Sequence, residues 1–542
     1  MSAPWVPSVA DRYDDETVKR FYDEGFWRDE VLTDYLDRWC QSQPETVYAT
    51  DGHLTLTYAE LQGRAYRLAA ALRRLGVGAG DRVVVQLPNW SEFAVSYVAL
   101  ARLGAILVPI MTIYRHDEVA YIADFAGARG IVTTGDFRGF DYLGMVREIR
   151  PQCGSVRFVV AVRASAGPDE LTFEELTAGD GVPGDGDLGP APGPDEAHIC
   201  IFTSGTESRP KGCVHTFNTF ATSLRGLGAS LGVQPGDTTF MPSPVAHATG
   251  LAVGVGVPLV AGTSTHLLDA WDPAVGLARI AEHRCTNTLT AAPFVQMALD
   301  AFDPGAHDMS SMRAWGCAGA PIPPSMVERA AELWPSTHIL SAYGRSETFL
   351  TTVCALDDPV ERSVSSDGKP FTGVDLAIID DEIVQRGPGV LVGYWNNPEL
   401  TGQAFDADGW CHSGDLGRLD DRGYLRVTGR SKDIIIRGGA NISAREVEDH
   451  LRAHPKIADV AVVAMPDEKL GERACAFVVL RAGSAAPGLD ELKEFLTGER
   501  KVSVTKVPER LEVIDALPMT ATGKVQKFAL RDRIRRLLET SG

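Results

Sequence analysis

The pattern of hydrophobic and polar residues predicts that helices and strands alternate in the first part of the chain. Thr57 and Glu60 have the spacing of a capping box, which marks the start of a helix. Behind them, apolar residues recur at steps of four and three, and Gly76 is placed to end the helix. These residues form one face of an amphipathic helix: Leu61, Ala65, Leu68, Leu72 and Leu75.

The segments that follow extend the alternation. Residues 83–87 predict a buried strand, residues 93–103 a helix and residues 106–110 a second strand. Such an order is typical of an α/β sheet with covering helices. Glycine, proline and aspartate then gather between residues 164 and 197 and predict a flexible acidic connector, which ends at a short apolar strand over residues 199–202.

The last part of the chain predicts a smaller unit. Further α/β pattern continues to about Tyr394, and a turn-rich segment opens near Gly429. Strand-like runs follow at residues 460–465 and 476–480, and a basic helix closes the chain. A chain of 542 residues is too long for one hydrophobic core, so two or more domains are expected.

Charge and cysteine usage narrow the functional classes. A formal net charge of -20 argues against a general nucleic-acid binder, which needs clustered lysine and arginine. The nine cysteines are scattered and lack C-x-x-C spacing, which indicates reduced thiols rather than a zinc site or a disulfide framework. The N-terminus is acidic and no apolar run reaches the roughly 20 residues of a membrane helix. A soluble, cytoplasmic protein without a membrane partner is expected.

One loop has the composition of a phosphate-binding site. Residues 203–212 follow the strand and read Thr-Ser-Gly-Thr-Glu-Ser-Arg-Pro-Lys-Gly. Backbone N–H groups of a glycine-containing turn form an anion-binding concavity, hydroxyl groups add donors, and Lys211 adds a point charge. The loop is not a Walker motif, because no glycine directly precedes Lys211 and no serine or threonine follows it. Taken alone, such a loop is a surface turn at least as often as a phosphate site, and the other motifs decide between the two. In a phosphate site the binding residues would be Thr203, Ser204, Gly205, Thr206 and Lys211.

With six further segments in the same order, this loop resembles the signature of the adenylate-forming superfamily, which includes acyl-CoA synthetases, adenylation domains of peptide synthetases and firefly luciferase. The resemblance covers nearly the whole chain. The segments are Gly316-Cys317-Ala318-Gly319-Ala320-Pro321, Tyr343-Gly344-Arg345-Ser346-Glu347, Gly414-Asp415-Leu416, Gly429-Arg430-Ser431-Lys432-Asp433, Arg437-Gly438-Gly439-Ala440-Asn441-Ile442 with Glu446-Val447-Glu448, and Pro518-Met519-Thr520-Ala521-Thr522-Gly523-Lys524.

The resemblance implies an α/β fold of unequal parts. It implies a large N-terminal domain, with α/β sheets and a small β-barrel-like subdomain, over residues 1–429. A hinge over residues 430–433 would join it to a small mobile α+β domain over residues 434–542. The large domain would bind ATP and the acid. The small domain would carry the catalytic lysine and the thiolation face.

The resemblance also assigns residues to the first half-reaction, in which a carboxylate attacks the α-phosphate of ATP. Glu347 would hold Mg²⁺, Tyr343 and Gly344 would adjoin the adenine, and Ser346 would donate near the α-phosphate, where the family usually has threonine. Lys524 would reach in from the small domain and neutralise the charge that develops. The remaining nucleotide-binding residues would be Gly319, Ala320 and Pro321 in the adenine pocket, Asp415 on the ribose, and Arg430.

The second half-reaction is expected to use coenzyme A as a thiol acceptor. The family rotates its small domain about the hinge, which withdraws Lys524 and presents the loop that begins at Arg437, Gly438 and Gly439. Lys432 would absorb the backbone change. His247 resembles the catalytic-site residue at the junction of the acid pocket and the thiol tunnel in acyl-CoA synthetases.

The acid is expected to be aliphatic or alicyclic. Residues 241–250, the expected acid pocket, contain no aspartate to pair with an α-ammonium group, which disfavours an amino acid. Ala248 stands where activators of aryl acids typically have asparagine. The closest subgroup is cyclohexanecarboxylate-CoA ligase-like, on the basis of Ser243-Pro244-Val245-x-His247, Ala270-Trp271-Asp272-Pro273 and the unusual Glu207-Ser208 in the phosphate loop. Whether Glu207 turns to Mg²⁺ or to Arg209 stays open.

Four alternatives to an acid–CoA ligase are kept. One is a biosynthetic enzyme that passes its adenylate to a carrier protein or an amine. Another is a ligase-like diazotase that activates nitrite, and a third is a luciferase-type oxygenase. The fourth is a nucleotide-binding pseudoenzyme, against which the retention of both Glu347 and Lys524 argues. The expected state is a monomer or homodimer.

Overall fold

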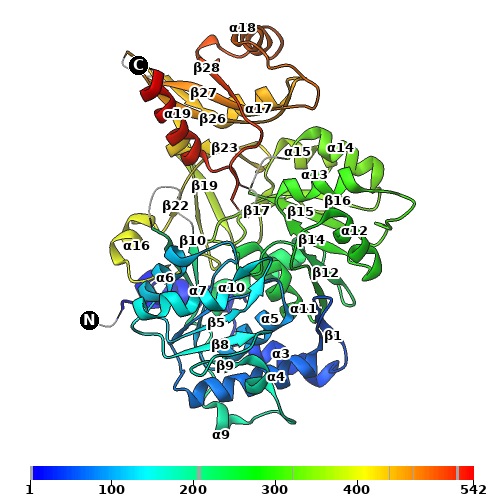
Figure 1. Cartoon of the computed structure of the whole chain (residues 1–542), viewed down its shortest axis with the longest axis vertical. Helices are drawn as coiled ribbons and strands as arrows, with labels where there is room; N and C mark the ends of the chain where they lie inside the picture. The colour runs from blue at the N-terminus through cyan, green and yellow to red at the C-terminus, as the bar shows by residue number, and fades with distance from the viewer. Residues whose placement is uncertain are drawn as a thin grey trace. The chain divides into compact units, whose positions relative to one another are not determined.

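The structure is a computed structural model that describes residues 4–203, 209–319, 322–438, 440–467, 469–520 and 524–541. The described residues form two compact units. The large unit contains residues 4–203, 209–375 and 386–411, and the small unit contains residues 376–385 and the described residues from 412 onward. Each unit has its own sheets and cores, so the α/β fold with a separate smaller C-terminal part is confirmed (Figure 1).

An eight-stranded, mostly parallel sheet forms the first half of the large unit. Residues on its strands alternate between two cores: Val83 and Val85 pack with helices α4 and α5, while Val84 packs with α6 and α7. Its order is β21 (Gly393–Tyr394), β11 (Lys211–Thr216), β10 (Ala197–Thr203), β4 (Ile106–Pro109), β3 (Arg82–Gln86), β5 (Gly130–Thr134), β8 (Phe158–Val162) and β9 (Leu171–Thr172). The helices are α4 (Tyr58–Arg74), α5 (Ser91–Arg102), α6 (His116–Phe125) and α7 (Tyr142–Ile149).

The predicted capping box and helix are confirmed in α4. The hydroxyl of Thr57 accepts a hydrogen bond from the backbone N–H of Glu60 (3.2 Å), and the Glu60 carboxylate accepts one from the N–H of Thr57 (2.8 Å). Leu61, Ala65 and Leu68 are fully buried on the face that the sequence periodicity predicts. Gly76 follows the helix with a positive φ of 84°.

A nine-stranded sheet forms the second half of the large unit. Helices α5 and α10 (Phe217–Ser230) are buried over most of their length, and one core contains Val85 of the first sheet and Met241 of the second. The order is β18 (Lys369–Pro370), β17 (Thr352–Val353), β16 (His338–Tyr343), β15 (Ala314–Ala318), β14 (Asn287–Thr290), β12 (Thr238–Met241), β13 (Ser264–Leu267), β1 (Val47–Thr50) and β2 (Thr55–Thr57). The other face packs against α12 (Pro273–Glu282), α13 (Ala292–Ala301) and α14 (Pro324–Leu333).

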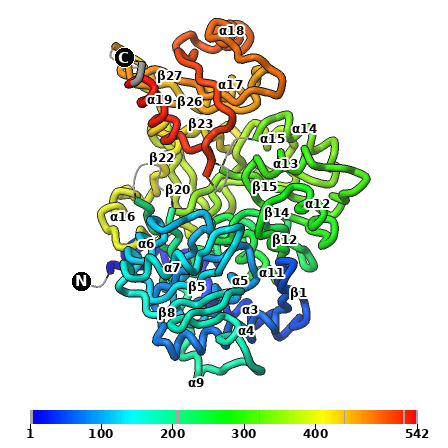
Figure 2. Tube along the Cα trace, viewed as in Figure 1, coloured from blue at the N-terminus to red at the C-terminus, as the bar shows by residue number. Residues whose placement is uncertain are grey.

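Short elements complete the large unit. They are α1 (Val9–Arg12), α2 (Asp15–Asp23), α3 (Leu32–Ser42), α8 (Phe173–Thr177), α9 (Asp185–Leu188), α11 (Val257–Ala261), α15 (Val360–Ser365), α16 (Pro398–Ala404) and the hairpin of β6 (Asp136–Phe137) and β7 (Phe140–Asp141). Segments distant in sequence meet here, along the chain path that Figure 2 traces: the indole N–H of Trp395 donates to the carbonyl of Phe125 at the end of α6 (3.2 Å).

The region predicted to be a flexible connector is packed against the large unit. Arg67 on α4 donates to the carbonyls of Thr177 and Gly181, both at 2.7 Å. Arg102 on α5 donates to the carboxylate of Asp185 at 2.7 Å. The apolar side chains of Phe173 and Leu188 are buried in the same core as α4. Arginine side chains on neighbouring helices therefore bind a segment whose composition alone indicates a loose linker.

The small unit has two sheets. The first contains β19 (Asp375–Ile379), β20 (Glu382–Arg386), β22 (Cys411–Leu419) and β23 (Leu425–Arg430). The second contains β25 (Ala440–Ser443), β24 (Ile434–Arg437), β27 (Gly471–Leu480), β26 (Ile457–Asp467) and β28 (Arg510–Val513), so both strands predicted from the sequence are confirmed. Val460 and Val462 of β26 face α17 (Ala444–Arg452) and α18 (Leu489–Glu494), whereas Ala461 and Val463 face the basic helix α19 (Lys527–Ser541).

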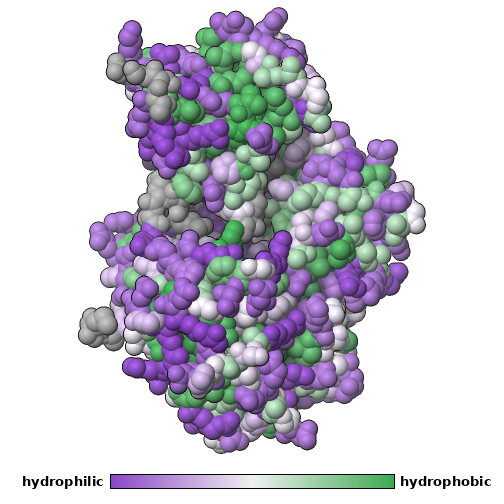
Figure 3. All heavy atoms as spheres, viewed as in Figure 1, coloured by the Kyte–Doolittle hydropathy of each residue, from purple (hydrophilic) through white to green (hydrophobic). Residues whose placement is uncertain are grey.

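Within the described ranges, no helix combines the length and the apolar character that crossing a bilayer requires. The face of the large unit in Figure 3 is mainly hydrophilic, with hydrophobic residues scattered over it.

Candidate functional site

The carboxyl ends of neighbouring parallel strands bring three predicted segments to one edge of the nine-stranded sheet. Strands β15 and β16 run parallel, and Ala318 pairs with Ala342. Gly319 and Tyr343, the next residue of each chain segment, are therefore neighbours at the ends of adjacent strands. Strand β12, on the far side of β14, ends at Met241 and leads into the segment with His247. Ligands of open α/β sheets bind at such an edge. Ala320 and Pro321 lie outside the described residues.

Lys211 reaches this edge from the other sheet. It is the first residue of β11 and pairs with Thr203, the last residue of β10, so the two residues stand at the two ends of the predicted phosphate loop. Its Nζ lies 2.8 Å from Oε1 of Glu347 and 2.8 Å from the hydroxyl of Tyr394. The Tyr394 hydroxyl in turn donates to Oε1 of Glu347 at 2.9 Å. Ser204, Gly205 and Thr206 lie outside the described residues, as do Glu207 and Ser208.

The carboxylate of Glu347 is buried but stays charged. Burial alone would raise the pKa of Glu347, but the positive charges of Arg345 and Lys211 outweigh it and hold the pKa well below its usual range. Burial, together with the charge of Glu347, raises the pKa of Tyr394 far above its usual range, so that hydroxyl keeps its proton. The centre of the site is therefore a lysine–carboxylate pair joined by a neutral phenol.

The loop that carries Glu347 has a fixed backbone. A Cβ atom on Gly344 would stand 2.0 Å from the carbonyl oxygen of Phe349, so only glycine fits there. The carbonyl of Ser346 accepts a hydrogen bond from Nε2 of His215 (2.8 Å). Burial lowers the pKa of His215 to about 4, which keeps its imidazole neutral and suited to donate from this one nitrogen.

The segment expected to line the acid pocket is anchored by a side chain from the first sheet's loops. The amide of Asn89 donates to the carbonyls of Ser243 (2.8 Å) and Met241 (3.2 Å), and its oxygen accepts from the N–H of Val245 (2.8 Å). His247 follows, half-buried, and its Nδ1 accepts from the N–H of Thr249 at 3.4 Å. The next residues form a buried π-helix, Gly250–Gly256, a feature that is frequent at functional sites.

In the small unit, Asp415 and Arg430 form an ion pair. They lie opposite each other on strands β22 and β23, with Arg430 Nε 3.0 Å from Asp415 Oδ1. Asp415 is buried, whereas Arg430 is about half-exposed. The loop before Asp415 is tied down by Glu382, whose carboxylate accepts from the N–H of Gly414 (2.6 Å). The two residues that the sequence assigns to nucleotide binding are thus adjacent within this unit.

The predicted thiolation loop is the turn of the β24–β25 hairpin. Arg437 ends β24, and its guanidinium forms two hydrogen bonds with the carboxylate of Glu509, at 2.8 and 3.2 Å. Gly438 follows with a φ of 56°, and its N–H donates to the carbonyl of Leu470 (2.7 Å). Gly439 lies outside the described residues.

Two hydrogen bonds join Lys524 to Thr520, ahead of helix α19. The Lys524 N–H donates to the Thr520 hydroxyl (3.0 Å), and its carbonyl accepts from the Thr520 N–H (2.7 Å). The side chain is half-buried. Two ion pairs on the helix that follows bind it to the body of the unit: Lys527 with Glu448 (2.7 Å) and Arg531 with Asp433 (3.3 Å).

Sequence analysis found some of these groups and missed others. It placed Lys211 and Glu347 in one site, and the structure brings their side chains into contact. It missed Tyr394, Asn89 and His215, which hold the site together through buried hydrogen bonds. Tyr394 stands in an apolar run, Val-Gly-Tyr-Trp, which by itself predicts a core strand, while an asparagine after strand β3 is a weak signal for a polar anchor.

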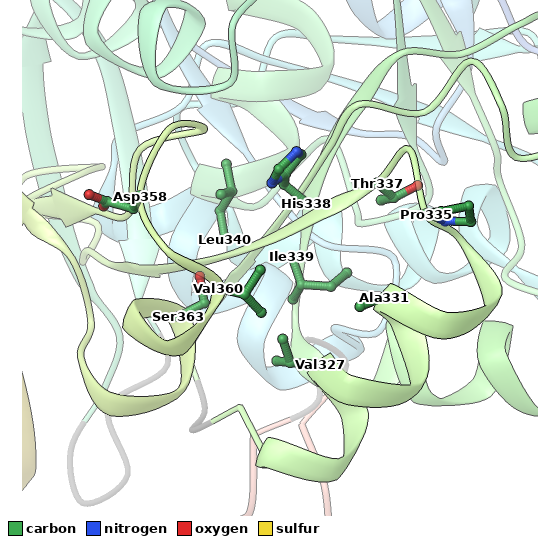
Figure 4. A pocket seen from close by; sticks show the side chains of 10 residues that line it. All are labelled: Val327, Ala331, Pro335, Thr337, His338, Ile339, Leu340, Asp358, Val360 and Ser363. Atoms are coloured by element: carbon green, nitrogen blue, oxygen red, sulfur yellow. The ribbon is translucent and has the colours of Figure 1, made fainter.

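A separate cavity of about 130 Å³ lies in the large unit. It is bordered by α14, β16 and α15, and Figure 4 shows Val327, Ile339 and Val360 around its centre. None of the site residues predicted from the sequence lines it.

Comparison with known proteins connects this geometry to a family. The model of the AMP-binding enzyme family matches residues 36–395, and the model of the AMP-binding enzyme C-terminal domain matches residues 446–524. The medium-chain fatty-acid–CoA ligase of Escherichia coli is 36% identical over 97% of this chain and 94% of its own length. The 3-[(3aS,4S,7aS)-7a-methyl-1,5-dioxo-octahydro-1H-inden-4-yl]propanoyl:CoA ligase of Mycobacterium tuberculosis is 35% identical over 92% of this chain and 97% of its own.

A solved structure agrees along the same length. The crystal structure of ATP-bound MatB from Rhodopseudomonas palustris has a TM-score of 0.83 with this chain at 26% identity, and covers 94% of this chain and 100% of its own.

Proposed function

Because the chain belongs to the AMP-binding enzyme family and is an AMP-forming acid–CoA ligase, we propose that it activates an apolar aliphatic or alicyclic carboxylic acid. The acid carboxylate attacks the α-phosphorus of ATP, the bond to the β-phosphate breaks, and pyrophosphate leaves with the bonding electrons. The observation that supports the proposal is the 2.8 Å contact between Lys211 and Glu347, the residues that we propose to bind the polyphosphate and the metal.

In the first half-reaction, the main task of the protein is to stabilise negative charge. Negative charge grows on the oxygens of the α-phosphate and of the departing pyrophosphate, so fixed cations and donors lower the barrier. In the proposal, Thr203, Ser204, Gly205, Thr206 and Lys211 bind the polyphosphate. Ser346 and Lys524 act at the α-phosphate. Gly319, Ala320, Pro321, Tyr343 and Gly344 enclose the adenine, and Asp415 with Arg430 binds the ribose side.

The donor set at Glu347 suits Mg²⁺. Magnesium takes hard oxygen ligands and is usually bound by one or two carboxylates together with substrate phosphates. Glu347 supplies an ionised carboxylate at the edge where the nucleotide is expected, and the described residues contain no group of three or more side chains that would form an all-protein metal cage. When bound, Mg²⁺ would neutralise phosphate charge. The protein's part is to keep the Glu347 carboxylate charged and correctly oriented.

The second half-reaction passes the acyl group to a thiol. The sulfur attacks the acyl carbon, the bond to AMP breaks, and AMP leaves. In the proposal, the domain of residues 434–542 rotates about the hinge of residues 430–433, with Lys432 taking up the backbone change. The turn of Arg437, Gly438 and Gly439 then faces the site in place of Lys524. His247 lies at the point where the acid and the thiol meet.

The proposed class of acid substrate follows from the charges in the expected acid pocket. Residues 241–250 include no carboxylate, so a substrate ammonium group would be buried without a partner. Two relatives at 36% and 35% identity are ligases whose names give a medium-chain fatty acid and a ring-bearing propanoyl group. Both acids present an apolar body behind one carboxylate, which favours the same class here.

The test is acid-dependent release of AMP and pyrophosphate from ATP. Hexanoate, octanoate, cyclohexanecarboxylate, salicylate, an α-amino acid and nitrite would be compared, each with and without coenzyme A. The proposal predicts turnover with the first three acids that requires coenzyme A and forms the thioester. Preference for salicylate, for the amino acid or for nitrite would overturn the substrate class. Sustained AMP release that never requires coenzyme A would point instead to transfer to a carrier protein or an amine.

A further inference from the structure

Residues 391–395 connect strand β11, which begins with Lys211, to the loop that carries Glu347. The N–H of Leu391 donates to the carbonyl of Glu347 (2.8 Å), which joins this segment to the metal-binding loop. The N–H groups of Val392 and Trp395 donate to the carbonyls of Val214 (3.0 Å) and Gly212 (2.8 Å), which joins it to β11. Tyr394 therefore stands between the strand of Lys211 and the loop of Glu347.

The hydroxyl of Tyr394 serves both side chains at once. It accepts from the ammonium of Lys211 (2.8 Å) and gives its single proton to Oε1 of Glu347 (2.9 Å). The Lys211 Nζ also lies 4.4 Å from the centre of the phenol ring. These contacts use one donor and one acceptor site of the hydroxyl, and the tyrosine is buried.

Lys211 is proposed to bind two anions, the Glu347 carboxylate and the polyphosphate, whereas the Tyr394 hydroxyl donates to Glu347 as a neutral group. Lys211 neutralises the carboxylate through its ion pair with Oε1. The Tyr394 O–H lies 2.9 Å from Oε1 and would stay within reach if Lys211 turned toward a polyphosphate, whereas Arg345 lies 3.9 Å from Oε2. A neutral donor orients the carboxylate without cancelling its charge, which a metal ligand requires.

We infer that Tyr394 is a positioning residue that holds the Glu347 carboxylate in its metal-binding orientation while Lys211 moves between that carboxylate and the nucleotide phosphates. The inference rests on the proposed roles of Glu347 and Lys211. It adds a third residue to them, one that touches neither metal nor phosphate.

The N-terminal residues hold the Tyr394 segment from its other side. The indole N–H of Trp27 donates to the carbonyl of Pro388 (2.9 Å). The Tyr13 hydroxyl lies 3.1 Å from the carbonyl of Gly387, and the backbone of Trp5 pairs with that of Asn396 (3.0 Å). A side chain that must position a ligand gains precision from such a fixed backbone.

The experiment compares Tyr394→Phe with Tyr142→Phe in the full-length enzyme. Tyr142 is a matched control, because it is also buried and its hydroxyl donates to a backbone carbonyl, that of Thr112 (2.6 Å), with no contact to the Lys211–Glu347 pair. Electron paramagnetic resonance would measure binding of Mn²⁺ in the presence of α,β-methylene-ATP. Mg²⁺ titrations of ATP–pyrophosphate exchange would run alongside.

Loss of one hydrogen bond to a charged group predicts that Y394F binds Mn²⁺ about 10-fold more weakly and needs about 10-fold more Mg²⁺ for half-maximal exchange. The maximal exchange rate at saturating Mg²⁺ should change much less, and Y142F should match wild type in both assays. Equal Mn²⁺ affinity in Y394F and wild type would overturn the inference, as would a lower exchange rate with an unchanged Mg²⁺ requirement. The proposed function would instead be refuted if the wild type exchanged pyrophosphate with none of the acids. The Mn²⁺ measurement requires no acid turnover, so the two failures can be told apart.

Discussion

The ammonium nitrogen of Lys211 lies 2.8 Å from Oε1 of Glu347, although the two residues come from different sheets. Glu347 is 5% exposed, so its charge depends on this partner and on Arg345. The pair stabilises the buried carboxylate, and its two charges are the ones that the nucleotide and its metal are proposed to take over. Binding must therefore exchange one set of ion pairs for another.

Removal of one partner should expose the coupling. Lys211→Met should destabilise the protein by about 2 kcal/mol, because it leaves a buried carboxylate with less compensation, although Arg345 and Tyr394 remain. The double variant with Glu347→Gln should recover at least half of that loss. Urea denaturation of the two single variants and the double variant measures the coupling, and strictly additive effects would show that the contact contributes nothing.

Acid should weaken the fold through buried neutral histidines. Burial lowers the pKa of His198 to about 3, of His215 to about 4 and of His266 to about 3, against about 6.5 in an unfolded chain. The unfolded chain therefore takes up protons first. The stability that these residues contribute is present above pH 6.5 and is lost as the pH falls toward about 4 for His215 and about 3 for His198 and His266. Each lost contribution amounts to roughly 1.4 kcal/mol at pH 5.5.

Thermal denaturation between pH 7.5 and 5.5 measures this effect in the full-length protein. The melting temperature should fall steadily below pH 6.5. His215→Gln should show a shallower fall than wild type, because one of the titrating groups is gone. A melting temperature that is constant down to pH 5.5 would contradict the account.

The stability of the small unit should depend on the buried ion pair of helix α19 and hardly at all on its exposed one. Lys527→Ala should cost about 2 kcal/mol, since the ammonium is 2.7 Å from the buried Glu448 and both side chains are largely covered. Arg535→Ala on the same helix, where the side chain is 61% exposed, should change stability by less than about 0.5 kcal/mol. Equal effects in urea denaturation would refute the anchoring role of Lys527.

The sequence predicted the elements and the members of the site better than it predicted their contacts. Helix α4 follows from local signals, the Thr57–Glu60 capping box and the apolar face of Leu61 and Leu68. The Lys211–Glu347 contact does not follow from local signals, because it depends on how two sheets pack. The ordered set of motifs placed both residues in one site without giving their distance.

The role of Tyr394 could not be predicted from the sequence. Its hydroxyl has a function only because β21 pairs with β11 and the next loop folds beside Glu347. The prediction of a flexible connector was wrong for a similar reason. Arg67 and Arg102 lie far from this segment in the sequence but donate hydrogen bonds to its carbonyls in the fold. Tertiary hydrogen bonds decide both cases.

The central claim is that one chain performs two half-reactions and that Lys524 serves only the first. The most direct measurement takes Lys524→Ala and assays acid-dependent pyrophosphate release separately from conversion of supplied acyl-AMP and coenzyme A to the thioester. We expect the first rate to fall by about 100-fold or more, because a charge on the transition state loses its partner, and the second to stay within about threefold of wild type. Equal loss of both rates would contradict the account.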